Sequence, residues 1–324
     1  MTAGQTLFVL VGALVLEATF GYPDWLYQRI GHPVSWIGRL ISFLDQRLNR
    51  ESDSTQARRR AGMVALLIIV AVPGVIAWLV EDILDHHVIG PVVVALFAST
   101  LIASRSLYDH VGAVARALDQ YGLQDAREAV GRIVGRNPQT LDEHGVARAA
   151  IESLAENASD GIVAPVFWFA ILGLPGFVAY KAINTADSMI GHRTPRHEAF
   201  GWASARLDDL VNLPASRLTA LLLAVAAMVT PGASTAGALE AVSRDASKHR
   251  SPNAGWPESA IAGALGLKLN GPKVYGEVRV EDAYMGDGRR DATADDIRAA
   301  LRLTATAWGI MVATLLFLAI ILQD

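Results

Sequence analysis

Cysteine is absent from all 324 residues of the sequence. Disulfides, thiolate nucleophiles and cysteine-based metal sites are therefore excluded, so any metal ion must be held by oxygen or imidazole ligands. Such ligands favour hard cations, above all Mg²⁺. Three familiar signatures are also missing, namely the phosphate loop GxxxxGK[ST], the nucleophile elbow GxSxG and the zinc motif HExxH. Scanning for common motifs therefore names no enzyme.

The sequence also lacks an excess of positive charge. Its 28 Lys and Arg residues are outnumbered by 32 Asp and Glu residues, for a formal net charge of -4. No overall basic field attracts nucleic acid, and we expect no nucleic-acid partner. The apolar fraction of 52% and mean hydropathy of +0.31 exceed those of ordinary soluble domains. This balance indicates membrane helices joined by functional loops, with the lipid bilayer as a partner.

Five stretches approach the roughly 20 apolar residues that a membrane-spanning helix needs. They are residues 7–20, 62–80, 90–103, 215–229 and 303–322. No basic leader precedes the first, so we interpret it as a retained helix. We predict an all-α, polytopic integral membrane protein with about four to six membrane segments. Residues 1–324 form one membrane-embedded domain, with a soluble helical loop region at 104–161 and a Gly-rich polar loop region at 232–302.

Charge around the second apolar stretch predicts its orientation. Arginines cluster before it, whereas acidic residues follow it, and the positive-inside rule places the arginines in the cytoplasm. The arginines are Arg47, Arg50, Arg58, Arg59 and Arg60, and the acidic residues are Glu81, Asp82 and Asp85. We therefore predict a multi-pass protein of the cell (inner) membrane.

Residues 162–183 can be interpreted in two ways. Two short apolar runs flank Gly173-Leu174-Pro175-Gly176, which is a strong turn signal. The segment is either one broken helix or a re-entrant hairpin, and we favour the hairpin because it returns the next polar segment to the same side. A difficulty remains with this choice. The next span would carry 232–302 to the opposite face unless part of that region dips back.

The segment AAIESLAENASDG at 149–161 is the first of four candidate site clusters. In a helix, Glu152 and Glu156 are neighbours at spacing i, i+4, and Asp160 extends that face. Like charges so placed repel unless a divalent cation or a basic group lies between them, as in a Mg²⁺ site. The alternative is a solvated acidic face followed by a turn.

Two further clusters border apolar segments. The segment NTADSMIGH carries Asn184, Asp187 and Ser188, which are either helix-end caps or part of a shared site. The next cluster precedes a membrane span and is either a ligand site or an interfacial ion pair. It comprises Arg206, Asp208, Asp209, Asn212 and Arg217. Because the clusters at 152–160 and 184–188 lie within a few dozen residues of each other, we favour one site built from those two.

The fourth cluster lies in the segment SPNAGWPESAIAGALGLKLNGPKVYG at 251–276. Glycine-rich backbone with basic residues upstream favours an anion site. Ser251 and Asn253 are the candidate ligand contacts. Gly263 and Gly266 fit equally well a role in helix packing, because small residues let helices approach closely.

Together these segments resemble the CobD/CbiB family of cobalamin biosynthesis proteins, the adenosylcobinamide-phosphate synthases. The resemblance runs in order through nearly the whole chain. It rests on HPVSWIGRLI, VGR, ARAAIESLAENASDG, NTADSMIGHR, FGWASARLDDLVNLPASRLTALLL, SPNAGWPESAIAGALG and GDGRR. One departure is Asn137-Pro138 after VGR, where the family commonly has Asp-Thr, which weakens a catalytic role for that turn.

The resemblance implies an ATP-dependent amide ligase that joins aminopropanol or its phosphate to a propionate of adenosylcobyric acid. It implies Mg²⁺ as cofactor, ATP as cosubstrate and other cobalamin-pathway enzymes as possible partners. Glu152, Glu156, Asp160 and Asp187 are expected to handle Mg²⁺ or the amine, with Glu156, Asp160 and Asp187 as metal ligands. Asn157 and Asn184 are expected to orient oxygens. Arg193, Arg206 and Arg217 are expected to neutralise phosphate or corrinoid carboxylates.

Two other functions fit some of the residues. A membrane prenyltransferase also holds Mg²⁺-diphosphate with Asn and Asp near the bilayer boundary, but a second Asp-rich repeat is missing here. A corrinoid-binding transporter is the non-enzymatic alternative, since broken helices such as that around Gly173 often line transport sites.

Overall fold

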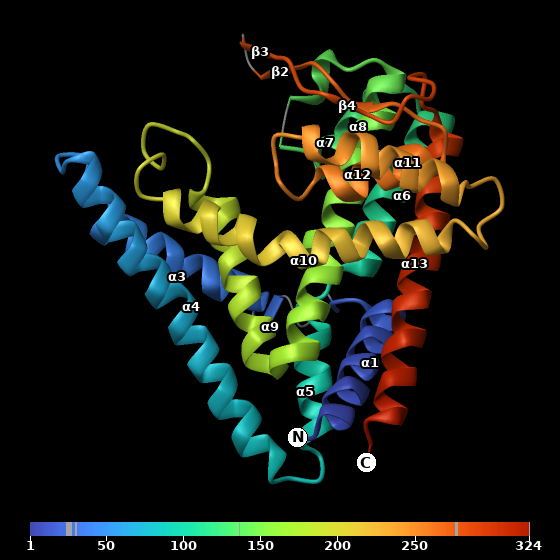
Figure 1. Ribbon diagram of the computed structural model, residues 1–324. Coiled ribbons are helices and arrows are strands. Elements are labelled where there is room, and N and C mark those ends of the chain that lie inside the picture. Colours follow the sequence, from blue (N-terminus) through green and yellow to red (C-terminus); the bar gives the residue numbers. More distant parts are fainter. Residues whose placement is uncertain (24–27, 30, 136, 276–277, 324) are drawn as a thin grey trace. The chain divides into compact units, whose positions relative to one another are not determined.

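A computed structural model describes all residues except 24–27, 30, 136, 276–277 and 324. Arg136 of the VGR motif therefore lies outside the described residues. The described chain is almost entirely helical (Figure 1). Its longer helices are α1 (Ala3–Phe20), α3 (Pro33–Leu48), α4 (Thr55–Asp85), α5 (Gly90–Ser99), α6 (Ser104–Gln120), α8 (Glu143–Ala158), α9 (Ala164–Ile190), α10 (Trp202–Ala226) and α13 (Ala294–Ile321). Shorter helices are α7 (Leu123–Gly131), α11 (Thr235–Asp245) and α12 (Gly255–Ala264), with the π-turn η2 (Ser159–Val163) between α8 and α9.

The chain divides into two compact units. The first comprises Met1–Ala103, Ala164–Asn212 and Leu315–Asp324, and the second comprises Ser104–Val163 and Leu213–Thr314.

Six helical stretches are long and apolar enough to cross a membrane by length and composition. They are Ala3–Phe20, Thr55–Asp85, Gly90–Gln120, Glu143–Ile190, Trp202–Ala226 and Ala294–Ile321. On α4, large apolar side chains such as Leu67, Ile76 and Trp78 are more than half exposed. A soluble protein rarely exposes so many large apolar side chains on one helix to water, whereas a helix that faces lipid requires them. The predicted all-α, multi-pass membrane architecture is confirmed.

The chain reverses direction inside α9, where Gly173 has φ +65 and ψ -156 (Figure 1). The rings of Phe169 and Phe177 lie 5.6 Å apart, although eight residues of straight helix would separate them by about 12 Å. Trp168 and Tyr180 bind to the neighbouring residues 211 and 212 of α10, one from each arm. The predicted hairpin is therefore present as a pair of antiparallel helical arms.

Glu81 of α4 holds the turn of this hairpin. Its Oε1 accepts a hydrogen bond of 3.2 Å from the backbone N–H of Leu174, one of the orphan donors at the start of the second arm. A β-carbon at Gly173 would lie only 2.8 Å from the same oxygen. The reversal therefore needs glycine both for its backbone angles and for the space that Glu81 occupies.

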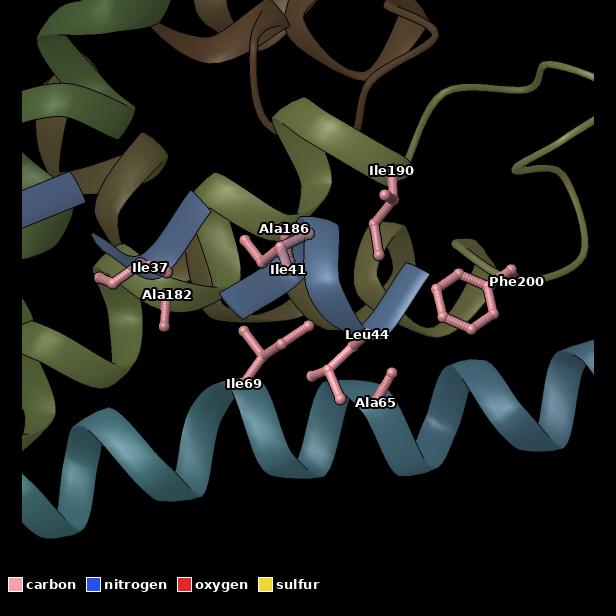
Figure 2. Packing of buried hydrophobic residues seen from close by; sticks show 9 residues of the cluster. All are labelled: Ile37, Ile41, Leu44, Ala65, Ile69, Ala182, Ala186, Ile190 and Phe200. Atoms are coloured by element: carbon pink, nitrogen blue, oxygen red, sulfur yellow. The ribbon is translucent and has the colours of Figure 1, made fainter. Parts of the chain in front are cut away.

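A hydrophobic core in the first unit fixes the second arm of α9 against α3 and α4 (Figure 2). Ile41 and Ile69 are fully buried at its centre, and Phe200 closes it from the segment that follows α9. The cluster comprises Ile37, Ile41, Leu44, Ala65, Ile69, Ala182, Ala186, Ile190 and Phe200. Alanine at 182 and 186 lets the three helices approach closely at the level of the polar residues Asn184 and Asp187.

In the second unit, α11 and α12 cross with Gly237 against Gly263, and a β-carbon on either would strike the other's carbonyl. Gly263 therefore serves helix packing, and Gly266, with φ +62, turns the chain after α12. The segment 232–302, interpreted from sequence as a Gly-rich polar loop region, also contains short antiparallel strand pairs. These are β1 (Leu269–Asn270) with β4 (Tyr284–Met285) and β2 (Lys273–Tyr275) with β3 (Val278–Val280).

Replacing Gly173 with alanine should destabilise the first unit. The backbone conformation of Gly173 belongs to a region that is essentially restricted to glycine, and forcing another residue into it costs on the order of 1–3 kcal/mol. We expect a lower midpoint of thermal unfolding in detergent. Gly309→Ala in α13 is the matched control, because nothing lies within 4 Å of the added methyl group. Equal midpoints for the two variants would contradict the assigned role of the turn.

Candidate functional site

A buried network of acid and amide side chains joins the second arm of α9 to α10. Asp208, 8% exposed, accepts hydrogen bonds from Asn184 Nδ2 at 3.3 Å and from Asn212 Nδ2 at 3.0 Å. The amide oxygen of Asn212 accepts in turn from the Tyr180 hydroxyl at 2.8 Å. Residues that the sequence pattern placed in two separate clusters, around 184 and around 208, thus form one structural group, here called the acid–amide cluster (Tyr180, Asn184, Asp187, Asp208 and Asn212).

Asp187, like Asn184, is a half-buried member of this cluster. It lies close enough to Asp208 for their charges to interact, and its Oδ1 occupies the space where a β-carbon of Gly191 would be. Glycine at 191 therefore leaves room for this carboxylate at the end of α9. Ser188, by contrast, is exposed and donates to the backbone carbonyl of Asn184 on its own helix.

A cavity of about 250 Å³ adjoins the cluster through Gly191. Its lining residues are Arg59, Gly191, Arg193, Glu198, Trp202, Ala205, Arg206 and Asp209. Arg193, Arg206 and Asp209 are among the predicted site residues, whereas Arg59, Glu198 and Trp202 are not. Arg59 was counted only as part of the basic loop, yet its guanidinium lies over the Trp202 ring, 5.0 Å from the centroid. We call this space the arginine pocket.

The segment 191–201, which forms one wall of the arginine pocket, is tied to α3 and α4 by hydrogen bonds. The Arg196 guanidinium donates twice to Asp45 Oδ2, at 3.1 and 2.9 Å. The Arg196 carbonyl accepts from Asn49 Nδ2 at 3.0 Å and from Arg58 Nη2 at 2.5 Å. Burial acts to raise the pKa of Asp45, but the hydrogen bonds from Asn49 and Arg196 outweigh it and the pKa is lowered.

The glutamate-rich segment of α8 belongs to the second unit. Glu152 is buried, and its Oε1 accepts a 2.8 Å hydrogen bond from the backbone N–H of Asn270. This contact gives Glu152 a structural role in holding β1. Glu156 and Asn157 lie exposed one turn further on, where Asn157 Nδ2 donates to the Ser153 carbonyl. Asp160 lies partly exposed in the π-turn, a type of helix defect found frequently at functional sites.

A second polar group of this unit surrounds Arg217. Its Nη1 donates to Asn253 Oδ1 and to the Pro252 carbonyl, each at 3.1 Å, and its guanidinium lies 4.4 Å from the centre of the Trp256 ring. Ser251 Oγ accepts from the backbone N–H groups of Asn253 and Ala254. Arg217, which we expected in one cluster with Arg206, therefore lies with Ser251 and Asn253, and their contacts brace the segment that leads into α12.

Among the residues that the structure describes, no group of three or more His, Asp and Glu side chains is arranged to hold a metal ion. Mg²⁺ usually takes only one or two protein carboxylates and completes its shell with water and substrate phosphate. Asp187 with Asp208 is such a pair. Each oxygen of Asp208 accepts one amide hydrogen bond and retains a second lone pair. The donor set therefore fits Mg²⁺ bound together with a phosphate, and does not form a closed cage.

The fold and these clusters define a multi-pass helical membrane protein with an acid–amide cluster beside an arginine pocket. A family profile described as CobD/Cbib protein matches residues 10–304, and the chain belongs to this family. It is 50% identical to "Cobalamin biosynthesis protein CobD" of Sinorhizobium sp, over 97% of this chain and 98% of that protein. Proteins of the same description from Rhizobium meliloti and Rhodobacter capsulatus are each 48% identical, over 95% and 91% of both chains respectively. No solved structure matches the chain.

Replacing Asp45 with asparagine should flatten the acid dependence of stability. Because the folded-state pKa of Asp45 is lowered, its carboxylate stabilises the fold above the unfolded-state pKa, and this stabilisation is lost as the pH falls through the folded value. At pH 7 we expect Asp45→Asn to unfold at a lower temperature than the unmodified protein. On acidification to pH 3, the unfolding midpoint of Asp45→Asn should fall by less than that of the unmodified protein. Thermal unfolding in detergent across this range measures both. Parallel curves for the two proteins would contradict the role given to Asp45.

Proposed function

We propose that the protein is an ATP-dependent amide ligase of cobalamin biosynthesis, joining aminopropanol or its phosphate to a propionate of adenosylcobyric acid. Membership of the CobD/Cbib family supports the pathway. The observation that carries the ligase is the arginine pocket beside the acid–amide cluster, which combines guanidinium groups for anions with carboxylates for an amine or a cation.

The proposed chemistry begins with activation, because a carboxylate anion has no good leaving group. The propionate oxygen attacks the γ-phosphorus of ATP, the β–γ bridging P–O bond breaks, and ADP leaves with the electron pair. The neutral amine then attacks the acyl carbon, inorganic phosphate leaves, and the amide nitrogen loses its proton. Guanidinium groups are suited to phosphate because their planar N–H forks bind two oxygens at once.

Asp187 and Asp208 would hold Mg²⁺, which supplies charge neutralisation on the phosphates when it is bound. Asn184 and Asn212 position Asp208 through their amide donors. Arg193 and Arg206 would neutralise phosphate or substrate carboxylate. A carboxylate such as Asp209 would accept a proton from the substrate ammonium, which gives the neutral amine that attacks. We propose that Glu156 and Asp160 of the second unit also take part, as the family resemblance implies.

Contacts inside the first unit support a proposal for the membrane side of these groups. The N-terminal amine of Met1 lies 2.6 Å from Asp85, and a β-carbon on Gly4 would lie 2.6 Å from the Leu322 carbonyl oxygen. Both termini therefore lie at the end of α4 opposite the basic loop. If that loop is cytoplasmic, the termini are outside, and one crossing by α13 returns residue 294 to the cytoplasm.

We infer from this count of membrane crossings that α10 does not cross the bilayer. The hairpin in α9 keeps its two ends on the cytoplasmic side, and α13 requires residues 227–293 to be on that side too. α10 would then begin and end in the cytoplasm. Residues 232–302 would therefore not be carried to the opposite face, which removes the difficulty that the hairpin created. Its sequence supports this placement, because α10 has the lowest hydropathy of the six membrane candidates. Its first half carries the polar residues Arg206, Asp208, Asp209 and Asn212. The inner membrane is the corresponding location.

Purified full-length protein in detergent tests the ligase directly. With adenosylcobyric acid, ATP, Mg²⁺ and either aminopropanol or its phosphate, we expect a corrinoid product heavier by the amine minus water, with one ADP formed per amide. Mass spectrometry and a coupled ADP assay measure both. Transport of the corrinoid across vesicles without covalent change would instead favour the transporter, and turnover of a prenyl diphosphate would favour the prenyltransferase.

Single substitutions at the proposed acidic residues should then separate chemistry from folding. We expect Glu156→Ala, Asp160→Asn and Asp187→Asn each to lower amide formation by roughly 100-fold or more, the scale on which positioned acids and bases contribute. The matched control is Glu240→Gln, a substitution of an exposed acid on α11. All variants should insert in the membrane. Near-normal turnover by a variant would remove its residue from the site.

A further inference from the structure

The arginine pocket contains an unassigned cation, Arg59 at the start of α4. Its neighbours Arg58 and Arg60 are basic too, but the three side chains do different things. Arg58 donates to Asn49 and to the Arg196 carbonyl, and Arg60 is exposed and does not line the pocket. Arg59 alone of this triplet lines the pocket, with its guanidinium stacked on Trp202.

Stacking on an aromatic ring orients Arg59 for anion binding. A guanidinium that lies over an indole is held by cation–π attraction, while its N–H groups point outward in the plane of the fork. A guanidinium held in this way keeps N–H donors with which an oxyanion can form two hydrogen bonds. The 5.0 Å distance between Arg59 Cζ and the Trp202 ring centre is typical of this arrangement.

The size of the pocket restricts the ligand. Its volume of about 250 Å³ lies below the roughly 300–1,000 Å³ of sites for drug-sized molecules. A corrin ring with its side chains, or a whole nucleoside triphosphate, exceeds such a space. A short-chain phosphate ester fits within it.

The charges of the lining residues restrict the ligand further. Arg59, Arg193 and Arg206 contribute three positive charges, and Glu198 and Asp209 two negative ones, which leaves a balance of +1. A phosphomonoester carries about -1.5 to -2 at neutral pH, so an aminoalkyl phosphate with its ammonium has a net charge near -1. Arg206 and Asp209 form an ion pair of 3.7 Å among the lining residues, so the pocket presents both signs of charge to a ligand that carries both.

We infer that the arginine pocket binds the amine cosubstrate as a small aminoalkyl phosphate and that Arg59 is the residue that selects for the phosphate. The phosphate is held by Arg59, Arg193 and Arg206, and the ammonium by Asp209 and Glu198. This assignment rests on the proposed ligase, but binding to the pocket requires neither ATP nor a corrinoid. The two can therefore be tested separately.

Isothermal titration of the purified full-length protein in detergent, without ATP or corrinoid, tests the assignment. The probes are O-phosphoethanolamine, inorganic phosphate and ethanolamine. We expect the phosphoamine to bind more tightly than phosphate, and ethanolamine to bind weakest. Arg59→Gln should weaken binding of O-phosphoethanolamine by about 10- to 100-fold, the effect of losing hydrogen bonds from a charged group. The affinity of Arg59→Lys, which keeps the charge and loses the planar N–H fork, should lie between that of the unmodified protein and that of Arg59→Gln.

Arg60→Gln is the matched control, because it removes the same charge from the adjacent exposed position. Its affinity should equal that of the unmodified protein, and all variants should unfold at similar temperatures. Unchanged binding in Arg59→Gln, or equal losses in both glutamine variants, would overturn the assignment. Competition by ATP as strong as that by the phosphoamine would also overturn it. If the phosphoamine binds selectively but no amide forms, the assignment of the pocket holds and the proposed ligase is refuted. If amide forms and Arg59→Gln still binds the phosphoamine normally, the ligase holds and the assignment of the pocket is refuted.

Discussion

The turn at Gly173 is the constraint on which the first unit depends. It brings Trp168 and Tyr180, which a straight helix would separate by about 18 Å, to neighbouring positions of α10. The second arm of α9 can then pack on α3 and α4 and present Asn184 and Asp187 toward α10. Glu81 ties the turn to α4. Arg59 lies near the start of α4, so the same helix that supports the turn also lines the arginine pocket.

Local sequence patterns predicted a structural feature that depends on residues close together in the chain. Glycine and proline at 173–176 predicted the reversal, whereas the joining of Asn184 to Asp208 was not predicted, because it depends on the packing of α9 against α10. Long-range partners were not predictable. Glu152 was expected to handle Mg²⁺ or the amine, yet it binds the backbone of Asn270, 118 residues away. Arg59 was missed because only tertiary packing brings it beside Arg193 and Trp202.

The acid–amide cluster and the arginine pocket complement each other electrostatically. Asp187 and Asp208 are carboxylates of like charge at a partly buried position, and such an arrangement is costly without a compensating cation. Asn184 and Asn212 hold Asp208 in place with neutral donors, which do not cancel its charge. The adjoining guanidinium groups attract anions. A substrate pair that brings phosphate, ammonium and a divalent cation together satisfies both halves of this site.

The central claim is that all proposed substrate-contacting segments lie on one face of the membrane, and single cysteines in this cysteine-free chain test it most directly. Each is placed at an exposed position and labelled with an impermeant thiol reagent in oriented vesicles. The positions are Val88 between α4 and α5, Gln124 on α7, Pro195 after α9 and Ala236 on α11. We expect labelling at Val88 from the outside and at the other three from the cytoplasmic side. Labelling of Gln124→Cys and Pro195→Cys from opposite faces would contradict the hairpin, and labelling of Ala236→Cys from outside would show that α10 crosses the bilayer.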